Sequence, residues 1–166
     1  MGLFKNLLNK KSDKLNADSK IYSPLAGTVV PLSEVNDPVF AEEMMGKGAA
    51  VIPKKGQVLA PCDGEVLTVF RTLHAITIKA DTGAEMIIHV GLETVGLNGQ
   101  YFEAYVTDGA RIKKGELLLS FDLDQIKGLG YDVVTPVVIT NSVDYHQVEK
   151  TKKKEVSNKD LLISLV

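Results

Sequence analysis

Residues 70–95, FRTLHAITIKADTGAEMIIHVGLETV, decide the fold because they contain two apolar runs separated by a turn. The runs at residues 74–79 and 85–90 are rich in β-branched side chains, which favour extended strands. Residues 81–83 between them, Asp-Thr-Gly, have the composition of a tight turn. The sequence therefore predicts a β-hairpin of two antiparallel strands in this region.

Each run contains a histidine, His74 in the first and His89 in the second, and the two lie 15 positions apart. Facing residues of an antiparallel pair have numbers that add up to a constant sum. An odd sum would place both histidines on one face of the hairpin, opposite or diagonal, with both rings able to contact one small group. A slip of one residue would place them on opposite faces, and the sequence leaves this register open.

Composition excludes several classes of protein. The chain has 166 residues, a formal charge of −2 and 45% hydrophobic residues, which is typical of one soluble domain with a sizeable core. Its basic residues form no broad stripe through the apolar segments, so we expect no nucleic-acid partner. The single cysteine, Cys62, excludes an internal disulfide framework and suits a reducing compartment. Because no apolar run approaches the roughly 20 residues of a membrane span and the start lacks a signal peptide, the expected location is the cytoplasm.

Residues 1–20 are expected to form a flexible N-terminal tail ahead of a single domain at residues 21–166. Within the tail, residues 1–11 (MGLFKNLLNKK) have lysines around one side of a helix and four apolar side chains on the other: Leu3, Phe4, Leu7 and Leu8. Such a segment either frays in water or folds on an anionic membrane surface, and the sequence leaves both interpretations open. The second would give the protein a weak peripheral association with the inner face of the membrane.

Short apolar runs separated by turns continue along the rest of the chain. Residues 22–30 and 59–67 share the spacing Pro-x-x-Gly-x-Val. Residues 54–59 and 113–118 both read Lys-Lys-Gly, a polar residue and an apolar pair. Repeated strand–turn units of this kind predict an all-β fold, an antiparallel sandwich or barrel-like structure built partly by duplication.

Helical content is predicted to be small, with short helical turns at residues 38–48 and 122–127. Asp37 stands at the N-cap position of the first turn and Pro38 at its first helical position. Residues 161–166 are predicted to form a closing strand.

Two imidazoles on one face, next to Gly91 and Glu93, permit two kinds of chemistry. A neutral imidazole can attack phosphorus and hold a phosphoryl group on a ring nitrogen, while a neighbouring ring donates a hydrogen bond to the phosphoryl oxygens. Alternatively, two histidine nitrogens, a carboxylate such as that of Glu93 and a water can bind zinc. Paired histidines on a strand are also common as ordinary polar surface, and on the residues alone all three interpretations stay open.

Ordered motifs on both sides of the hairpin narrow these interpretations. Residues 70–95 resemble the paired-histidine signature of the glucose-type IIA domain of the bacterial phosphoenolpyruvate-dependent sugar phosphotransferase system. Five further segments match this family in the same order: residues 23–27 (SPLAG), 37–46 (DPVFAEEMMG), 60–64 (APCDG), 121–122 (FD) and 135–141 (TPVVITN). Together they cover about residues 21–145, and such an ordered set is far more specific than a histidine pair alone.

The resemblance implies a β-sandwich of the duplicated hybrid motif type, similar in topology to zinc endopeptidases that cleave cell walls, that needs no cofactor. Its activity would be that of a phosphotransferase component: His89 would accept a phosphoryl group from the histidine phosphocarrier protein and pass it to a cysteine on the IIB domain of a sugar permease. His74 would be the supporting histidine, oriented by a hydrogen bond from Thr72. Glu93 stands where the family commonly has aspartate, which keeps the carboxylate but lengthens its reach.

A carrier of this kind needs a shallow face that two different proteins can cover in turn. Eight residues match family positions around such a face: Val39, Phe40, Met44, Met45, Phe70, Ile87, Glu93 and Val95. Methionine suits a surface that repacks against several partners, and each apolar member is equally consistent with a place in the core.

Four residues outside this face have structural interpretations. Cys62 lies in a turn without the context of a IIB cysteine, so it is expected to be a packing residue, and His146 is expected to be surface. In the segment that corresponds to Gly115, the chain has Asn158 and Lys159 instead. One of these two is expected to adopt a left-handed backbone conformation at some energetic cost.

Two other functions stay open at this level. A zinc-dependent hydrolase of the related fold would use His74 and His89 as ligands, although no further histidine lies near the hairpin in sequence. A weaker form of this hypothesis is a zinc ion shared with a carboxylate of a partner. A regulatory binding module would use the same face to inhibit transporters or kinases, because a phosphoryl group there would repel an apolar or acidic partner.

Overall fold

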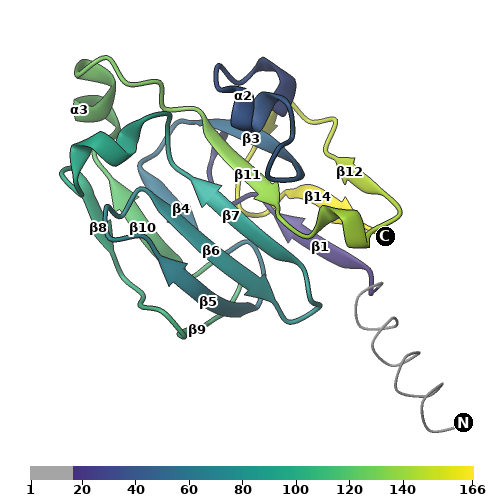
Figure 1. The fold of residues 1–166 in the computed structure, drawn as a ribbon. Helices are drawn as coiled ribbons and strands as arrows, with labels where there is room; N and C mark the ends of the chain where they lie inside the picture. The colour runs from purple at the N-terminus through teal and green to yellow at the C-terminus, as the bar shows by residue number, and fades with distance from the viewer. Residues whose placement is uncertain (1–16) are drawn as a thin grey trace, which may run out of the picture.

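The computed structural model describes residues 17–166, and most regular structure in that part of the chain is β (Figure 1). The strands are β1 (Ser19–Tyr22), β2 (Gly27–Pro31), β3 (Lys47–Pro53), β4 (Gln57–Leu59), β5 (Gly64–Val69), β6 (Ala75–Ala80), β7 (Glu85–His89), β8 (Phe102–Ala104), β9 (Arg111–Ile112), β10 (Leu117–Phe121), β11 (Thr135–Ile139), β12 (Val148–Lys150), β13 (Glu155–Val156) and β14 (Leu161–Leu165). The short helices are η1 (Leu32–Glu34), α2 (Pro38–Ala41), η2 (Thr94–Leu97), α3 (Leu123–Gly128) and η3 (Ser142–Asp144). The predicted all-β fold with short helical turns is confirmed.

The strands form three antiparallel sheets. An eight-stranded sheet has the order β13-β2-β3-β11-β7-β6-β5-β9, and two three-stranded sheets have the orders β1-β14-β12 and β4-β10-β8. The hairpin predicted from the sequence is β6 and β7, which lie side by side in the large sheet with Thr77 facing Ile87 (Figure 1). The strand predicted to close the fold is β14, at the centre of a small sheet.

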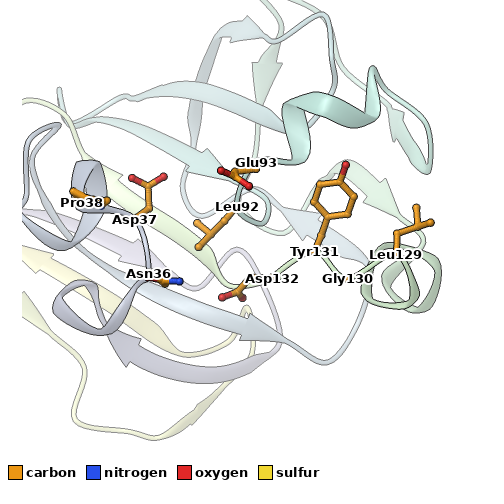
Figure 2. Close-up of a pocket in the computed structure, with 9 residues that line it drawn as sticks. All are labelled: Asn36, Asp37, Pro38, Leu92, Glu93, Leu129, Gly130, Tyr131 and Asp132. Carbon is orange, nitrogen blue, oxygen red and sulfur yellow. The ribbon is translucent and has the colours of Figure 1, made fainter.

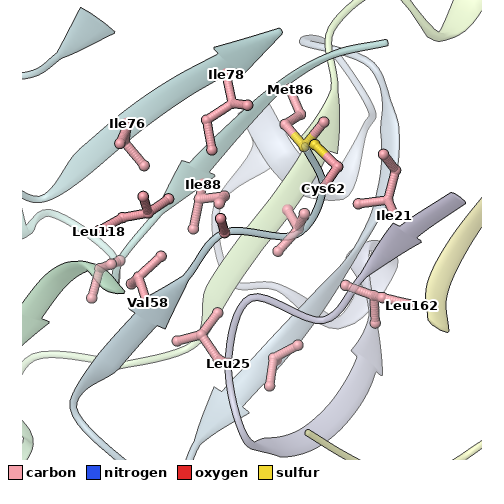
Figure 3. Close-up of a cluster of buried hydrophobic side chains, with 14 of the residues drawn as sticks. Ile21, Leu25, Val58, Cys62, Ile76, Ile78, Met86, Ile88, Leu118 and Leu162 are labelled. Carbon is pink, nitrogen blue, oxygen red and sulfur yellow. The ribbon is translucent and has the colours of Figure 1, made fainter. Parts of the chain in front are cut away.

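The main hydrophobic core joins the large sheet to both smaller sheets. The large sheet contributes buried side chains such as Ile88, the first small sheet contributes Leu162, and the second contributes Leu118 (Figure 3). Cys62 also lies in this core, and burial raises the pKa of its thiol to about 12. A thiol with that pKa stays protonated and unreactive at neutral pH, so the expectation that Cys62 is a packing residue is confirmed.

A second, smaller cluster covers the other face of the large sheet. Ile87 and Val138 of the sheet pack there against Leu32 and Phe40 of the β2–β3 connection. Side chains alternate between the two faces along a strand, so His89 projects from the same face as Ile87. The β2–β3 connection therefore packs directly beside the end of β7.

The strands at the two edges of the large sheet are arranged in the same way, as duplication predicts. At each edge, a two-residue strand pairs with a strand that begins at a glycine: β13 with β2, and β9 with β5. The registers also agree, because Val156 faces Gly27 and Ile112 faces Gly64. The spacing Pro-x-x-Gly-x-Val thus marks equivalent strands. The Lys-Lys-Gly echo precedes β4 and β10, which pair with each other in a small sheet.

The turn before β14 differs from the expectation. Among the described residues, Gly115 has a φ of 91°, but neither Asn158 nor Lys159 has a positive φ, so the prediction of a left-handed residue was wrong. The Asp160 N–H donates to the carbonyl of Ser157 and closes a four-residue turn, a geometry that ordinary residues adopt without strain. The Asn158 side chain stabilises this turn by donating to carbonyls in the β1–β2 and β4–β5 connections.

Both predicted helical turns are present, and each has an aspartate N-cap. The carboxylate of Asp37 accepts from the Val39 N–H at the start of α2, and that of Asp122 accepts from the Gln125 N–H at the start of α3. α2 is a single turn that ends well before residue 48, because the chain enters β3.

The folded domain begins slightly before the predicted boundary at residue 21. β1 starts at Ser19, which faces Leu165 of β14. The predicted amphipathic segment at residues 1–11 lies outside the described residues. No helix within residues 17–166 combines the length and the apolar composition needed to cross a membrane.

Candidate functional site

His74 and His89 meet at one end of the β6–β7 hairpin. Ala75 faces His89, so the numbers of facing residues add up to an even sum. The alternation rule then separates the two histidines, yet their ring centroids lie 4.8 Å apart with the ring planes at 87°. The histidines converge in the register that the sequence argument associated with opposite faces.

They converge because His74 lies outside the regular strand. β6 begins only at Ala75, and Leu73 has a left-handed φ of 59°. This backbone conformation interrupts the alternation of side chains. Leu73 packs against the main core, while the His74 ring contacts Phe70, which belongs to the second cluster on the other face. A rule for regular strands does not apply to such a residue.

His89 is the partly exposed member of the pair. Its Nδ1 lies 2.8 Å from the carbonyl oxygen of Gly91. A carbonyl only accepts hydrogen bonds, so the proton of the neutral ring is on Nδ1 and the lone pair is on Nε2. The Phe40 ring packs against the imidazole with the centroids 5.1 Å apart. His89 therefore has a fixed tautomer and one nucleophilic nitrogen.

His74 is the buried member, with only 3% of its surface exposed. Its Nδ1 lies 2.7 Å from Oγ1 of Thr72, the hydrogen bond that the resemblance implies. Phe70 packs edge-on against the ring, with the centroids 5.6 Å apart and the planes at 90°. Contacts on two sides hold this imidazole in place beside His89.

Both histidines are neutral at physiological pH. Burial, followed by the neighbouring charge of His89, lowers the pKa of His74 to about 4. Burial also lowers the pKa of His89, and this effect is opposed by the hydrogen bond to Gly91 and by the Asp37 carboxylate. A neutral imidazole is the form that attacks an electrophile, so the pair is in the reactive state.

An acidic cleft of about 520 Å³ is lined in part by Leu92 and Glu93, which follow His89 along the chain. Its walls come from the start of α2, the turn after β7 and the α3–β11 connection (Figure 2). Three of the lining residues are carboxylates: Asp37, Glu93 and Asp132. Such a cleft is complementary to a cationic group.

Comparison with known proteins identifies the family. Residues 19–145 match the model of the phosphoenolpyruvate-dependent sugar phosphotransferase system, EIIA 1. The chain belongs to this family. The glucose-specific EIIA component of Oceanobacillus iheyensis is 43% identical over 93% of this chain and 93% of its own length. The glucose permease IIA of Mycoplasma capricolum has the same fold, with a TM-score of 0.82 and 34% identity over 90% of this chain and 96% of that structure.

Other EIIA relatives are much longer. The β-glucoside-specific EIIBCA component of Bacillus subtilis is 48% identical over 87% of this chain, which corresponds to only 24% of that protein. This EIIA chain therefore spans about a quarter of such relatives and nearly the whole length of the EIIA component from Oceanobacillus.

Six of the eight residues predicted for a partner surface keep some exposure in the EIIA fold. Val39, Met44 and Val95 are 38%, 68% and 53% exposed. Glu93 is exposed, and Met45 and Phe70 are partly exposed. Phe40 and Ile87 are each only 4% exposed and belong to the second cluster, so for these two residues a place on the surface is wrong. From within this cluster, the Phe40 ring packs against His89.

The described EIIA residues contain no group of three or more His, Cys, Asp or Glu side chains that could hold a metal ion. Within residues 17–166, His74 and His89 thus have no third protein ligand of the kind that a zinc hydrolase site requires. Zinc shared with the carboxylate of a partner stays a prediction. The third histidine, His146, is exposed, as expected.

Sequence reasoning missed several residues of this EIIA site. Asp37 was identified only as a helix cap, although its carboxylate raises the pKa of His89. Asp132 and Tyr131 line the cleft from a connection that carries no motif of its own. The only available signal was their position just before the matching segment that begins at Thr135.

Proposed function

We propose that His89 carries a phosphoryl group from the histidine phosphocarrier protein to a cysteine on a IIB domain. The hydrogen bond from His89 Nδ1–H to the Gly91 carbonyl carries this proposal, because it leaves Nε2 unprotonated and nucleophilic at neutral pH. Membership of the EIIA family and the partial exposure of His89 support the same role.

The transfer conserves atoms and charge. The lone pair of His89 Nε2 forms a bond to phosphorus while the bond between phosphorus and the donor nitrogen breaks, and the donor ring keeps that electron pair. The His89 ring becomes positively charged, since Nδ1 keeps its proton. The Gly91 carbonyl and the Asp37 carboxylate both favour this charged ring, as their effect on the pKa of His89 indicates. Attack by a cysteine thiolate then reverses the step and restores neutral His89.

His74 has the complementary role of stabilising the phosphoryl oxygens. A ring with a pKa of about 4 is neutral and has a single N–H. When the Thr72 hydroxyl donates to Nδ1, that N–H is on Nε2 and is free to donate to the phosphoryl group. Thr72 thus selects the tautomer of His74, as the Gly91 carbonyl does for His89.

The exposed apolar residues around the pair suit partners that bind in turn. Val39 and Val95 lie within two residues of positions that line the acidic cleft, and together with Met44 they present apolar surface. A IIB domain as acceptor agrees with the names of relatives that combine IIA with IIB and IIC in one chain. We place this exchange in the cytoplasm, since a buried free thiol such as Cys62 suits a reducing compartment.

Labelling with radioactive phosphoenolpyruvate tests the proposal. In the presence of the purified general phosphotransferase proteins, the chain should gain one acid-labile, base-stable phosphate. His89→Ala should abolish this label, because the nucleophile is gone. His74→Ala should keep part of the label but block transfer to a IIB domain, because charge stabilisation is lost and the nucleophile is intact.

His146→Ala is the matched control, because it removes an exposed histidine outside the site. It should label and transfer like the unchanged protein. If His89→Ala still gained one equivalent of phosphate, another residue would be the carrier and the proposal would fail.

A further inference from the structure

The tautomer of His89 depends on the orientation of one main-chain carbonyl. That carbonyl belongs to Gly91, which has a left-handed φ of 74°. Several backbone conformations are accessible to glycine, so a turn around it does not by itself hold the carbonyl toward His89. Something outside Gly91 has to fix the two peptide planes on either side of it.

Apart from the bond between the Gly91 carbonyl and His89, each of these peptide planes has one hydrogen bond that holds it. Before Gly91, the carbonyl of Val90 accepts a hydrogen bond from Oγ1 of Thr94 at 2.5 Å. After Gly91, the N–H of Leu92 donates to the carbonyl of Asp132 at 2.9 Å. Only the first of these bonds comes from a side chain, so only Thr94 can be altered without changing the main chain.

Thr94 also encloses Gly91 sterically. Its side chain is fully buried, with 0% exposed surface. A Cβ atom on Gly91 would lie 2.7 Å from Cγ2 of Thr94 and 2.9 Å from the carbonyl oxygen of Asp132. Gly91 is therefore confined between the same two residues that provide the hydrogen bonds.

We propose that Thr94 is a positioning residue for the carrier histidine. Its hydroxyl holds the Val90–Gly91 peptide, the Gly91 carbonyl then stays directed at Nδ1 of His89, and the ring keeps its nucleophilic Nε2. Thr94 acts through Gly91 and touches neither the phosphoryl group nor a partner. The inference rests on the proposed role of His89, but it concerns the unphosphorylated ring and can be tested without any transfer.

Nitrogen-15 NMR of the histidine rings provides the test, because the shifts of Nδ1 and Nε2 report which nitrogen has the proton. The unchanged protein should show His89 as the Nδ1–H tautomer. Thr94→Val removes the hydroxyl at nearly constant volume and should shift the tautomer ratio roughly fivefold toward Nε2–H, as the loss of one net hydrogen bond does. Thr94→Ser restores a hydroxyl and should restore the original ratio.

Ser23→Ala is the matched control. Ser23 is also fully buried and its hydroxyl also donates to a main-chain carbonyl, that of Leu25, in the β1–β2 connection. A general loss of stability should appear in both Thr94→Val and Ser23→Ala, whereas the tautomer shift should appear only in the former. If the added methyl group beside Gly91 prevents Thr94→Val from folding, Thr94→Ala removes the same hydroxyl and is measured in the same way.

Unchanged His89 nitrogen shifts in the folded Thr94 variant would overturn the inference. The labelling experiment tests the carrier role separately, and its outcome does not depend on the NMR result. A protein that never accepts phosphate on His89 would refute the carrier role, whatever the tautomer in the free protein is.

Discussion

Two equivalent connections of the duplicated fold differ in length and meet at the histidine pair. β2 is joined to β3 by a long segment that contains η1 and α2, whereas β5 is joined to β6 by residues 70–74 alone. The flanking strands occupy matching places in the large sheet. A long connection can bury side chains of its own against the sheet, while a short one only turns the chain.

The two connections therefore contribute different things to one site. The long connection contributes a packing side chain and a charge: the Phe40 ring packs against His89, and the Asp37 carboxylate raises the pKa of His89. The short one supplies the second histidine itself and Thr72, its hydrogen-bond partner. The histidine pair thus arises from an asymmetry between halves whose strands are alike.

Removing the Phe40 ring should have the largest effect on stability. Phe40→Ala deletes a ring that is 4% exposed, and we expect the free energy of unfolding to fall by about 3 kcal/mol. Met44→Ala in the same connection is the control, because Met44 is 68% exposed and its truncation should cost less than about 0.5 kcal/mol. Urea unfolding of both variants gives the comparison. Equal losses would mean that the long connection does not depend on its buried ring.

The short connection should make stability depend on pH. His74 has a pKa of about 4 in the folded protein, below its ordinary value of 6.5. The unfolded chain therefore binds a proton first, so stability is complete above pH 6.5 and falls as the pH drops from 6.5 toward 4. The loss is at most about 3 kcal/mol.

His74→Gln isolates this contribution, because glutamine does not titrate. Urea unfolding between pH 7 and pH 4 should show a smaller loss of stability in the variant than in the unchanged protein, since carboxylates contribute equally to both. Parallel pH profiles for the two proteins would contradict the assignment of the slope to His74.

Asp37 in the long connection has two separable effects. Asp37→Ala removes the N-cap acceptor of α2 and should cost about 1 kcal/mol. Asp37→Asn keeps an acceptor and should preserve stability. Both variants remove the charge, so NMR titration should show a lower pKa of His89 in each, since the carboxylate raises that pKa. A His89 pKa unchanged in Asp37→Asn would show that the carboxylate does not act on the ring.

Features of the sequence that rest on local chemistry predicted the structure well. Apolar runs rich in β-branched residues on either side of a turn predicted the β6–β7 hairpin, and the aspartate at the N-cap position predicted the start of α2. The turn chemistry around residue 158 was misjudged, because the amide of Asn158 stabilises a turn without left-handed backbone. Side-chain hydrogen bonds to distant carbonyls leave no local pattern in the sequence.

The histidine pair shows where local rules end. In the register of β6 and β7, regular strands would direct His74 and His89 to opposite faces, and the left-handed backbone of Leu73 brings them to the same face. Leucine is not a residue that signals this conformation. The contact between Phe40 and His89 is equally non-local, because Phe40 reaches His89 only where the long connection folds back over the sheet. Family motifs pointed to the two histidines that the structure brings together, but their geometry came from tertiary packing.

The smallest effect concerns backbone strain, which both connections contain. Glu43, just after α2, is exposed and has a φ of 54°, while its neighbour Glu42 is exposed with a φ of −93°. Glu43→Gly should stabilise the protein by about 0.5 kcal/mol, because glycine adopts left-handed backbone without strain, and Glu42→Gly should destabilise it by a similar amount. Leu73→Gly in the short connection relieves the same kind of strain but should destabilise the protein, because Leu73 packs against the main core. Urea unfolding of the three variants should therefore show a higher free energy of unfolding for Glu43→Gly and a lower one for Leu73→Gly. If Leu73→Gly also raised the free energy of unfolding, strain and not packing would dominate in the short connection.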